Sequence, residues 1–110
     1  MNPFLAVTMQ DAADATGNGN ELPLIAQYGT FDEVAFQVSG TFVGTVTFEG
    51  TVDGTNWVAV EVQSATDVSV TATTATAAGI HFLTPAIYAS VRARVSAYTS
   101  GEITVVGLAK

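Results

Sequence analysis

The feature that most constrains the fold is a two-residue alternation of side-chain type near the C-terminal end. Between residues 90 and 97, apolar residues alternate strictly with polar ones: Val91, Ala93, Val95 and Ala97 against Ser90, Arg92, Arg94 and Ser96. Successive side chains of an extended strand point to opposite faces, so this pattern separates an apolar face from a polar one. The segment therefore predicts a strand that buries one face and leaves the other in water.

The same alternation recurs along most of the chain, interrupted by turn-forming residues. It predicts further strands over residues 34–39, 45–52, 57–62, 80–83 and 103–108, with another that starts at 68–70. Asp53-Gly54 is typical of a two-residue hairpin, because a type I′ turn requires positive φ. The segment Leu22–Tyr28 contains Pro23, which favours a sheet edge. Since no segment has a sustained 3.6-residue apolar period, we predict an all-β antiparallel sandwich or jelly roll of about seven or eight strands.

The apolar faces of these strands define a candidate core. Its predicted members are Phe36, Val38, Val46, Phe48, Trp57, Val60, Phe82, Val91, Val95, Ile103 and Val105. Burial of each large side chain contributes about 1.5–3 kcal/mol. A chain of 110 residues has the size of one domain. It needs no disulfide to fold, and it contains no cysteine.

The first 21 residues differ from the rest of the chain. Phe4, Leu5 and Val7 form a short apolar piece, which precedes a polar, glycine-containing stretch over residues 11–20. We therefore divide the chain into an N-terminal arm and loop, residues 1–21, and a β-sandwich domain, residues 22–110. An apolar arm on a flexible tether can reach a neighbour, so these three apolar residues are candidate partner-binding residues. The alternative is a first edge strand followed by a long loop.

The charge balance restricts the possible partners. Ten acidic residues against three basic ones give a formal net charge of −7. An acidic surface repels the phosphates of nucleic acids and anionic lipids, which argues against both kinds of partner. No apolar run approaches the roughly 20 residues that span a bilayer, and residues 1–10 lack the basic and apolar parts of a secretory signal. We expect a protein that is made in the cytoplasm and acts through protein contacts.

The sequence offers no set of residues for catalysis, and we expect no enzyme activity, no cofactor and no metal. His81 is the only histidine, and alternation places it opposite Ile80 and Phe82, toward solvent or an interface. One histidine without cysteine cannot form the usual zinc site. The turn from Asp53 to Asn56 offers oxygen ligands for calcium, but a hairpin turn explains it better, since an EF-hand loop carries more carboxylates.

Two arginines are notable because the chain has so few cations. Arg92 and Arg94 share one predicted strand face, where they could pair with Glu49, Glu61 or Asp67, or with acids of another subunit. The in-chain pairing is favoured. Both arginines are also candidate partner contacts.

Trp57 allows a carbohydrate-binding interpretation. Modules that bind sugars present two or three coplanar aromatic rings on one face, and Tyr88 and Tyr98 are the available companions. Burial of Trp57 in the core, directly after the turn, is the favoured alternative.

Three runs of this sequence resemble small structural proteins of tailed bacteriophages. The run GTVTFEGTVDGTNW at residues 44–57 is similar to a "GTVTFEGSxDGTNW" segment of that family. The runs TAAGI at 76–80 and VRARVSAYTSG at 91–101 are similar to its closing "TAAGxY…VRARVTAYTSGxVTV" segment. The resemblance covers about residues 34–108. It departs at His81, where an aromatic residue is expected, and the N-terminal arm has no counterpart. It implies a β-sandwich virion protein and carries over no catalytic residue.

The resemblance and the composition together suggest a capsid decoration, or cement, protein at the capsid surface of the virion. Its expected partners are the major capsid protein or other virion proteins, and a homo-oligomer, with a trimer favoured, would suit the symmetry of a shell. Strand faces rich in Thr, Ser and Ala can pack on a partner without the desolvation of charges. The alternatives are a tail, baseplate or fibre module, and a carbohydrate-binding module.

Overall fold

The computed structural model describes residues 4–26 and 29–110, and in these ranges every regular element is a β-strand. The strands are β1 (Leu5–Ala13), β2 (Leu22–Pro23), β3 (Ile25–Ala26), β4 (Gly29–Thr30), β5 (Val34–Ser39), β6 (Phe42–Thr51), β7 (Val58–Ala59), β8 (Val62–Ser64), β9 (Thr71–Ala72), β10 (Thr74–Ala75), β11 (Gly79–Leu83), β12 (Ser90–Gly101) and β13 (Ile103–Ala109). The described residues contain no helix that could cross a membrane.

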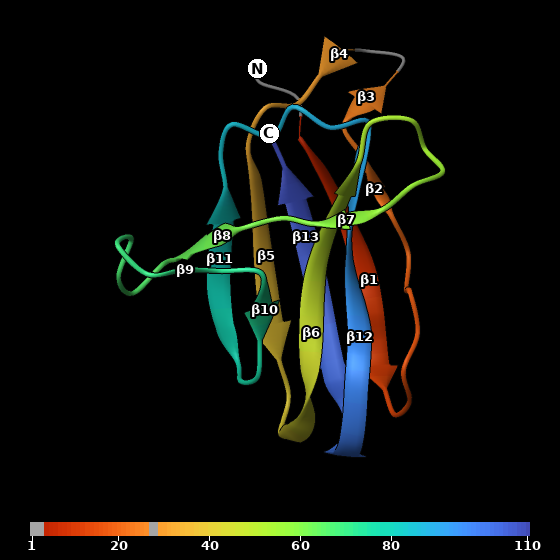
Figure 1. Cartoon of the computed structure of the whole chain (residues 1–110), viewed down its shortest axis with the longest axis vertical. Coiled ribbons are helices and arrows are strands. Elements are labelled where there is room, and N and C mark those ends of the chain that lie inside the picture. The colour runs from red at the N-terminus through yellow and green to blue at the C-terminus, as the bar shows by residue number, and fades with distance from the viewer. Residues whose placement is uncertain (1–3, 27–28) are drawn as a thin grey trace.

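Two antiparallel sheets pack face to face (Figure 1). The first, sheet A, has the strand order β1-β13-β5-β11-β8-β9. The second, sheet B, has the order β10-β6-β12-β2, with β7 also paired to β6. A separate small hairpin joins β3 to β4. The predicted all-β antiparallel sandwich is confirmed.

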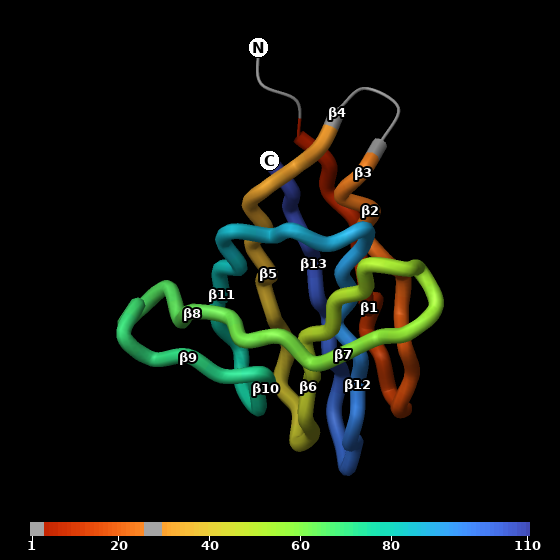
Figure 2. The backbone as a smooth tube through the Cα atoms, turned by 45° about the horizontal axis from the view of Figure 1, so that its top comes forward, coloured from red at the N-terminus to blue at the C-terminus, as the bar shows by residue number. Residues whose placement is uncertain are grey.

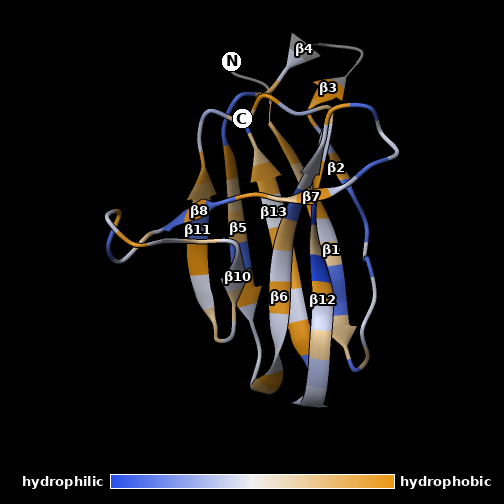
Figure 3. Cartoon of the chain, in the orientation of Figure 1, coloured by the Kyte–Doolittle hydropathy of each residue, from blue (hydrophilic) through white to orange (hydrophobic). Residues whose placement is uncertain are grey.

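The core lies between the two sheets. Nine of the eleven predicted core residues are buried, and the rings of Phe36 and Phe48 meet there with centroids 4.8 Å apart. The apolar bands along β5, β12 and β13 in Figure 3 include the residues of this interface. Trp57 is half-buried and Phe82 is 38% exposed, so these two predictions are wrong. Residues outside the predicted set also contribute: Met9, Leu22, Leu24, Val34, Val62, Ala75, Leu83, Ala86, Ala93 and Ala109.

The phase of β11 is the reverse of the prediction. His81 faces the interior, with its ring centroid 5.2 Å from that of Phe48, whereas Ile80 and Phe82 lie on the outer face. Successive side chains of β11 still point to opposite faces of the sheet, as predicted. The phase is reversed because Leu83, on the same side as His81, is the apolar residue that the sandwich buries.

The predicted return strand at 57–62 is split between the two sheets. After β6, a loop over residues 52–57 leads to β7, which pairs with β6 in sheet B, and the chain then crosses to β8 in sheet A. Asp53-Gly54 therefore lies in a six-residue loop rather than in a two-residue turn. Figure 2 shows the chain from β7 to β8, in green, running across the front of the view. The strand predicted to begin at Val68 is also wrong, because Val68 and Val70 are exposed in the turn before β9.

Residues 5–13 belong to the sandwich as an edge strand, which was the alternative to a free arm. β1 pairs antiparallel with β13, from Leu5 opposite Ala109 to Ala13 opposite Ile103. Met9 is part of the core, and the Gln10 side-chain amide donates to the Ala93 carbonyl at 2.9 Å. Residues 14–21 then return along the edge of β1 toward β2. In the predicted segment Leu22–Tyr28, Pro23 ends the short edge strand β2, and Gln27 and Tyr28 lie outside the described residues.

Candidate interaction surfaces

The outer face of sheet A is uncharged across five adjacent strands. The strand register aligns one row of side chains in the order Ala6, Leu108, Ala35, Phe82 and Gln63, and a second in the order Thr8, Val106, Gln37 and Ile80. Four of these side chains are large and apolar, and all four are solvent-accessible. In a chain with a net charge of −7, this face can be covered by another protein without stripping water from a charge.

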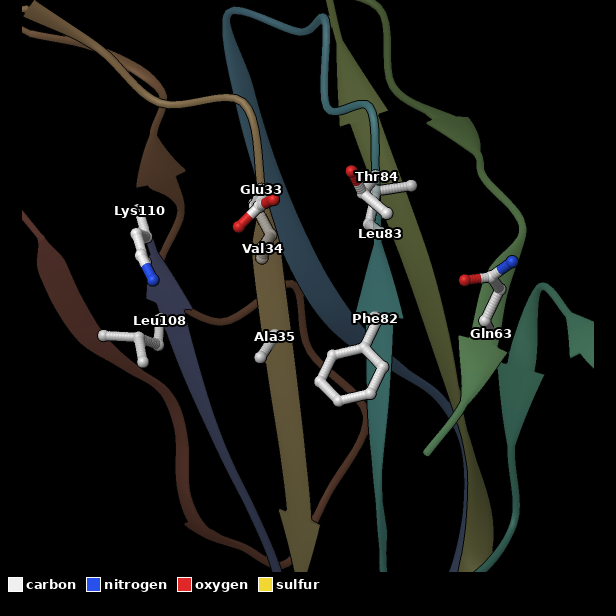
Figure 4. Close-up of a pocket in the computed structure, with 9 residues that line it drawn as sticks. All are labelled: Glu33, Val34, Ala35, Gln63, Phe82, Leu83, Thr84, Leu108 and Lys110. Carbon is white, nitrogen blue, oxygen red and sulfur yellow. The ribbon is translucent and has the colours of Figure 1, made fainter. Parts of the chain in front are cut away.

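A shallow groove of about 270 Å³ runs along this face at the end near the C-terminus. Figure 4 shows Leu108 on β13, Ala35 on β5 and Phe82 on β11 along its floor. Glu33 and Lys110 are the charged residues of the lining. The groove is therefore apolar in the middle and polar at its margins, which suits an apolar side chain from a partner.

The sequence did not predict this outer face because Phe82 was assigned to the core. The signal was present in the last strand, where Val106 and Leu108 alternate with Val105 and Gly107, so that both faces are apolar. A strand that is apolar on both faces in an antiparallel sheet indicates a second packing surface.

The outer face of sheet B carries the two arginines. Arg92 lies opposite Glu49 in the register of β12 and β6, and its Nε donates to Glu49 Oε1 at 2.9 Å. The Nε of Arg94 donates to Glu49 Oε2 at 3.2 Å. The Glu49 side chain is nearly buried between them. The favoured in-chain pairing is thus observed, with one carboxylate serving both guanidinium groups.

Trp57 contacts this cluster from the β6–β7 loop. The guanidinium carbon of Arg92 lies 4.1 Å from the centroid of the Trp57 ring, in a cation–π arrangement. One face of the indole is therefore covered by a cation. The predicted companion Tyr88 packs elsewhere, against Gly50, where a Cβ would lie 3.0 Å from its ring. These contacts weaken the interpretation of Trp57 as a sugar-binding platform.

The Asp53 loop is organised by its own hydrogen bonds. The carboxylate accepts from the backbone N–H and side-chain amide of Asn56, from the backbone N–H of Thr55 and from the Thr51 hydroxyl, at 2.7–3.0 Å. These donors hold the pKa of Asp53 well below its usual value. Gly54 adopts a φ of +80°. Because both carboxylate oxygens are engaged, the local hydrogen bonds explain the turn, and residues 4–26 and 29–110 contain no cluster of three candidate metal ligands.

His81 is half-buried, with its ring directed toward the core. Its Nε2 atom is buried and forms no hydrogen bond to the described residues. Burial lowers the pKa of the imidazole below its ordinary value, because the charged form loses hydration. No acid or nucleophile is recorded within hydrogen-bonding distance of His81 in the described chain, so the geometry offers no partner for acid–base chemistry.

The three N-terminal candidates have different environments. Phe4 precedes β1 and is 67% exposed, whereas Leu5 and Val7 lie in β1 and pack against the core. Leu5 and Val7 are therefore partly structural. Phe4 is the one of the three whose side chain faces solvent.

Comparison with known proteins finds no family model and no curated protein that matches this chain by sequence. Two solved structures are similar to it. The SPBc2 prophage-derived protein YomS has a TM-score of 0.84 at 20% identity, over 97% of this chain and 92% of YomS. The PBSX exported protein XepA has a TM-score of 0.87 at 17% identity, over 97% of this chain but only 37% of XepA. This chain thus shares its fold with two phage-derived proteins, with almost the whole of one and with about a third of the other.

Proposed function

We propose that this chain is a structural protein of a tailed-bacteriophage virion, and that it decorates the outer surface of the capsid shell. The single observation that carries the proposal is the uncharged outer face of sheet A, with Phe82, Ile80, Val106 and Leu108 accessible on it. The fold shared with phage-derived proteins and the resemblance over residues 34–108 support the phage assignment.

The surface chemistry favours permanent contact with a protein. A decoration protein needs a stable fold and a face that can bind another protein without the desolvation of charged groups. Here the face that would bind consists of apolar and neutral polar side chains, and most acidic residues lie elsewhere. The partner would be the major capsid protein, with three copies of this chain around a local three-fold position as the preferred arrangement.

Binding to undecorated capsids tests this proposal. Purified protein is mixed with expanded capsids that lack it, and co-sedimentation is measured for the wild type, Phe82→Lys and Val68→Lys. Both substitutions add one positive charge at an exposed apolar residue, but Val68 lies in the turn before β9, away from sheet A's outer face. We expect at least tenfold weaker binding for Phe82→Lys and wild-type binding for Val68→Lys. Equal binding by all three proteins would exclude this face.

A single substitution is needed to test whether the N-terminal residues contribute to capsid binding. Removal of residues 1–10 should abolish capsid binding, but it also removes Met9 from the core and most of β1 from sheet A. Phe4→Ser changes an exposed side chain only. Loss of binding by Phe4→Ser, with an unchanged melting temperature, would assign Phe4 to the interface; retained binding would remove it.

The position on the particle separates the shell from the tail. A gold or fluorescent label is attached to a single cysteine introduced by Val68→Cys, at an exposed residue away from the proposed binding face, and is imaged on intact virions. Labels over the whole shell support decoration, and labels at one pole support the alternative of a tail, baseplate or fibre module. Because XepA is described as an exported protein, the medium is also assayed. Label in the medium with none on purified particles would overturn the virion assignment.

A further inference from the structure

The two arginines of sheet B retain hydrogen-bonding capacity that the chain itself does not use. Each binds Glu49 through Nε alone, so neither forms the two-pronged contact that an arginine makes with a carboxylate. In the described part of the chain, no hydrogen bond is recorded from any of the four terminal Nη nitrogens. Two guanidinium groups against one carboxylate also leave a net positive charge at this point of an acidic molecule.

The cluster holds this charge in a fixed position. Arg92 is confined between Glu49 Oε1 and the Trp57 ring, and its side chain is only 15% exposed. Arg94 is 37% exposed. The adjacent hydroxyl groups are already paired, since Thr47 Oγ1 and Ser96 Oγ lie 2.7 Å apart. An incoming anion would therefore meet an Arg92 side chain that has lost most of its rotamer freedom in advance, which lowers the entropic cost of binding.

We propose that Arg92 and Arg94 form a receptor for a single carboxylate, the side chain of an Asp or Glu on a neighbouring protein. Arg94 would contact it directly, and Arg92, oriented by Glu49 and Trp57, would contribute charge and an Nη donor. A carboxylate is favoured over a polyphosphate because the net charge of −7 repels an extended polyanion, whereas one carboxylate is attracted at short range by the local excess of positive charge. The site lies on the sheet opposite the uncharged face and does not depend on a capsid partner.

Side-chain NMR of the isolated protein tests this site. The probe is the blocked peptide acetyl-Gly-Glu-Gly-amide, and its control is the same peptide with Gln in place of Glu. We expect the Nε–Hε signals of both arginines and the indole N–H signal of Trp57 to shift and to saturate, with a Kd of about 1–10 mM for a single charge-assisted contact. The Gln peptide should cause no saturable shift. Absence of saturation with the Glu peptide, or equal shifts with the two peptides, would overturn the proposal.

Variants test whether the Glu peptide binds at this site or is attracted to any cation of the protein. Arg94→Gln should weaken binding of the Glu peptide at least tenfold, and Arg94→Lys should recover part of the loss, because it restores charge but not the planar fork. Lys110→Gln removes the third cation of the chain and should leave the affinity unchanged. An equal loss in Arg94→Gln and Lys110→Gln would contradict a defined site. Backbone amide spectra report whether each variant remains folded.

The source of the carboxylate is resolved by sedimentation velocity. If a second copy of this chain supplies it, the wild type forms oligomers that dissociate in Arg94→Gln and at high salt. If the wild type sediments as a monomer, the carboxylate belongs to a different protein. Because peptide binding is measured without capsids, failure of the carboxylate site and failure of the decoration proposal remain distinguishable.

Discussion

Glu49 is the residue on which the polar outer face of sheet B depends. Its nearly buried carboxylate is the ion-pair partner of two adjacent arginines, so its neutralisation leaves both guanidinium groups without a counter-charge. Glu49→Gln should lower the free energy of unfolding by about 1–3 kcal/mol. This is less than the 3–5 kcal/mol expected for a fully buried pair, because Arg94 is partly hydrated. Urea denaturation at pH 7 measures this change in the free energy of unfolding. The matched control is Glu61→Gln, at an exposed acid without a recorded ion pair, which should change stability by less than about 0.5 kcal/mol.

His81 couples stability to pH. Because burial lowers the pKa of the folded-state imidazole below the ordinary 6.5, the unfolded chain binds its proton more readily than the folded chain. The stabilising effect of a neutral His81 is therefore complete above pH 6.5 and is lost as the pH falls through the folded-state pKa. We expect the urea midpoint to fall between pH 7.5 and pH 5.5.

The control for this pH dependence is His81→Phe, which keeps an aromatic ring against Phe48 but cannot titrate. The fall between pH 7.5 and pH 5.5 should be smaller in this variant than in the wild type. If both proteins lose the same stability over this range, the pH dependence comes from other groups. The carboxylates Asp53 and Asp67, whose pKa values are lowered by local hydrogen bonds, act at a more acid pH.

At the scale of elements, β1 is an edge strand that helps to close the core. Met9 is almost fully buried, and its terminal methyl occupies the space above Gly107 of β13, where a Cβ would overlap it. Met9→Ala should therefore cost about 2–5 kcal/mol. Differential scanning calorimetry would record this as a lower melting temperature. Thr8→Ala, one residue earlier on the exposed side of the strand, is the control and should leave the melting temperature nearly unchanged.

The elements differ in how well alternation predicts them. β12 is predicted well because only one of its faces, with Val91, Ala93 and Val95, can be apolar. In β11 both faces carry large side chains, so the pattern specifies a strand but not which side is buried, and the burial of Leu83 decides. The sequence does not reveal that the chain changes sheets after Ala59, because valine occurs at every second position both before and after this residue. The two candidate surfaces also differ in how well the sequence predicts them. Glu49 was among the predicted partners of the arginines, whereas the apolar outer face depends on how five strands align.

At the scale of the whole molecule, the acidic charge opposes the compact state. Ten acids face three bases, and two of those bases are already paired with Glu49, so most of the remaining acids repel one another without a nearby cation. Salt screens this repulsion over about 10 Å at 0.1 M. We therefore expect the melting temperature at pH 7.5 to rise by about 2–5 °C between 10 mM and 200 mM NaCl, as a gain of roughly 0.5–1 kcal/mol would produce.

A triple variant tests whether net charge causes this salt dependence. Glu33, Glu61 and Glu102 are exposed, and the described structure records no side-chain hydrogen bond for any of them. Their joint replacement by Gln removes three negative charges without a change in the core, so the melting temperature at 10 mM NaCl should rise and the response to salt should shrink. A wild-type melting temperature that falls with added NaCl would mean that screening of the Glu49 ion pairs outweighs screening of the repulsion. The stability of the sandwich would then depend more on that one polar cluster than on the net charge of its surface.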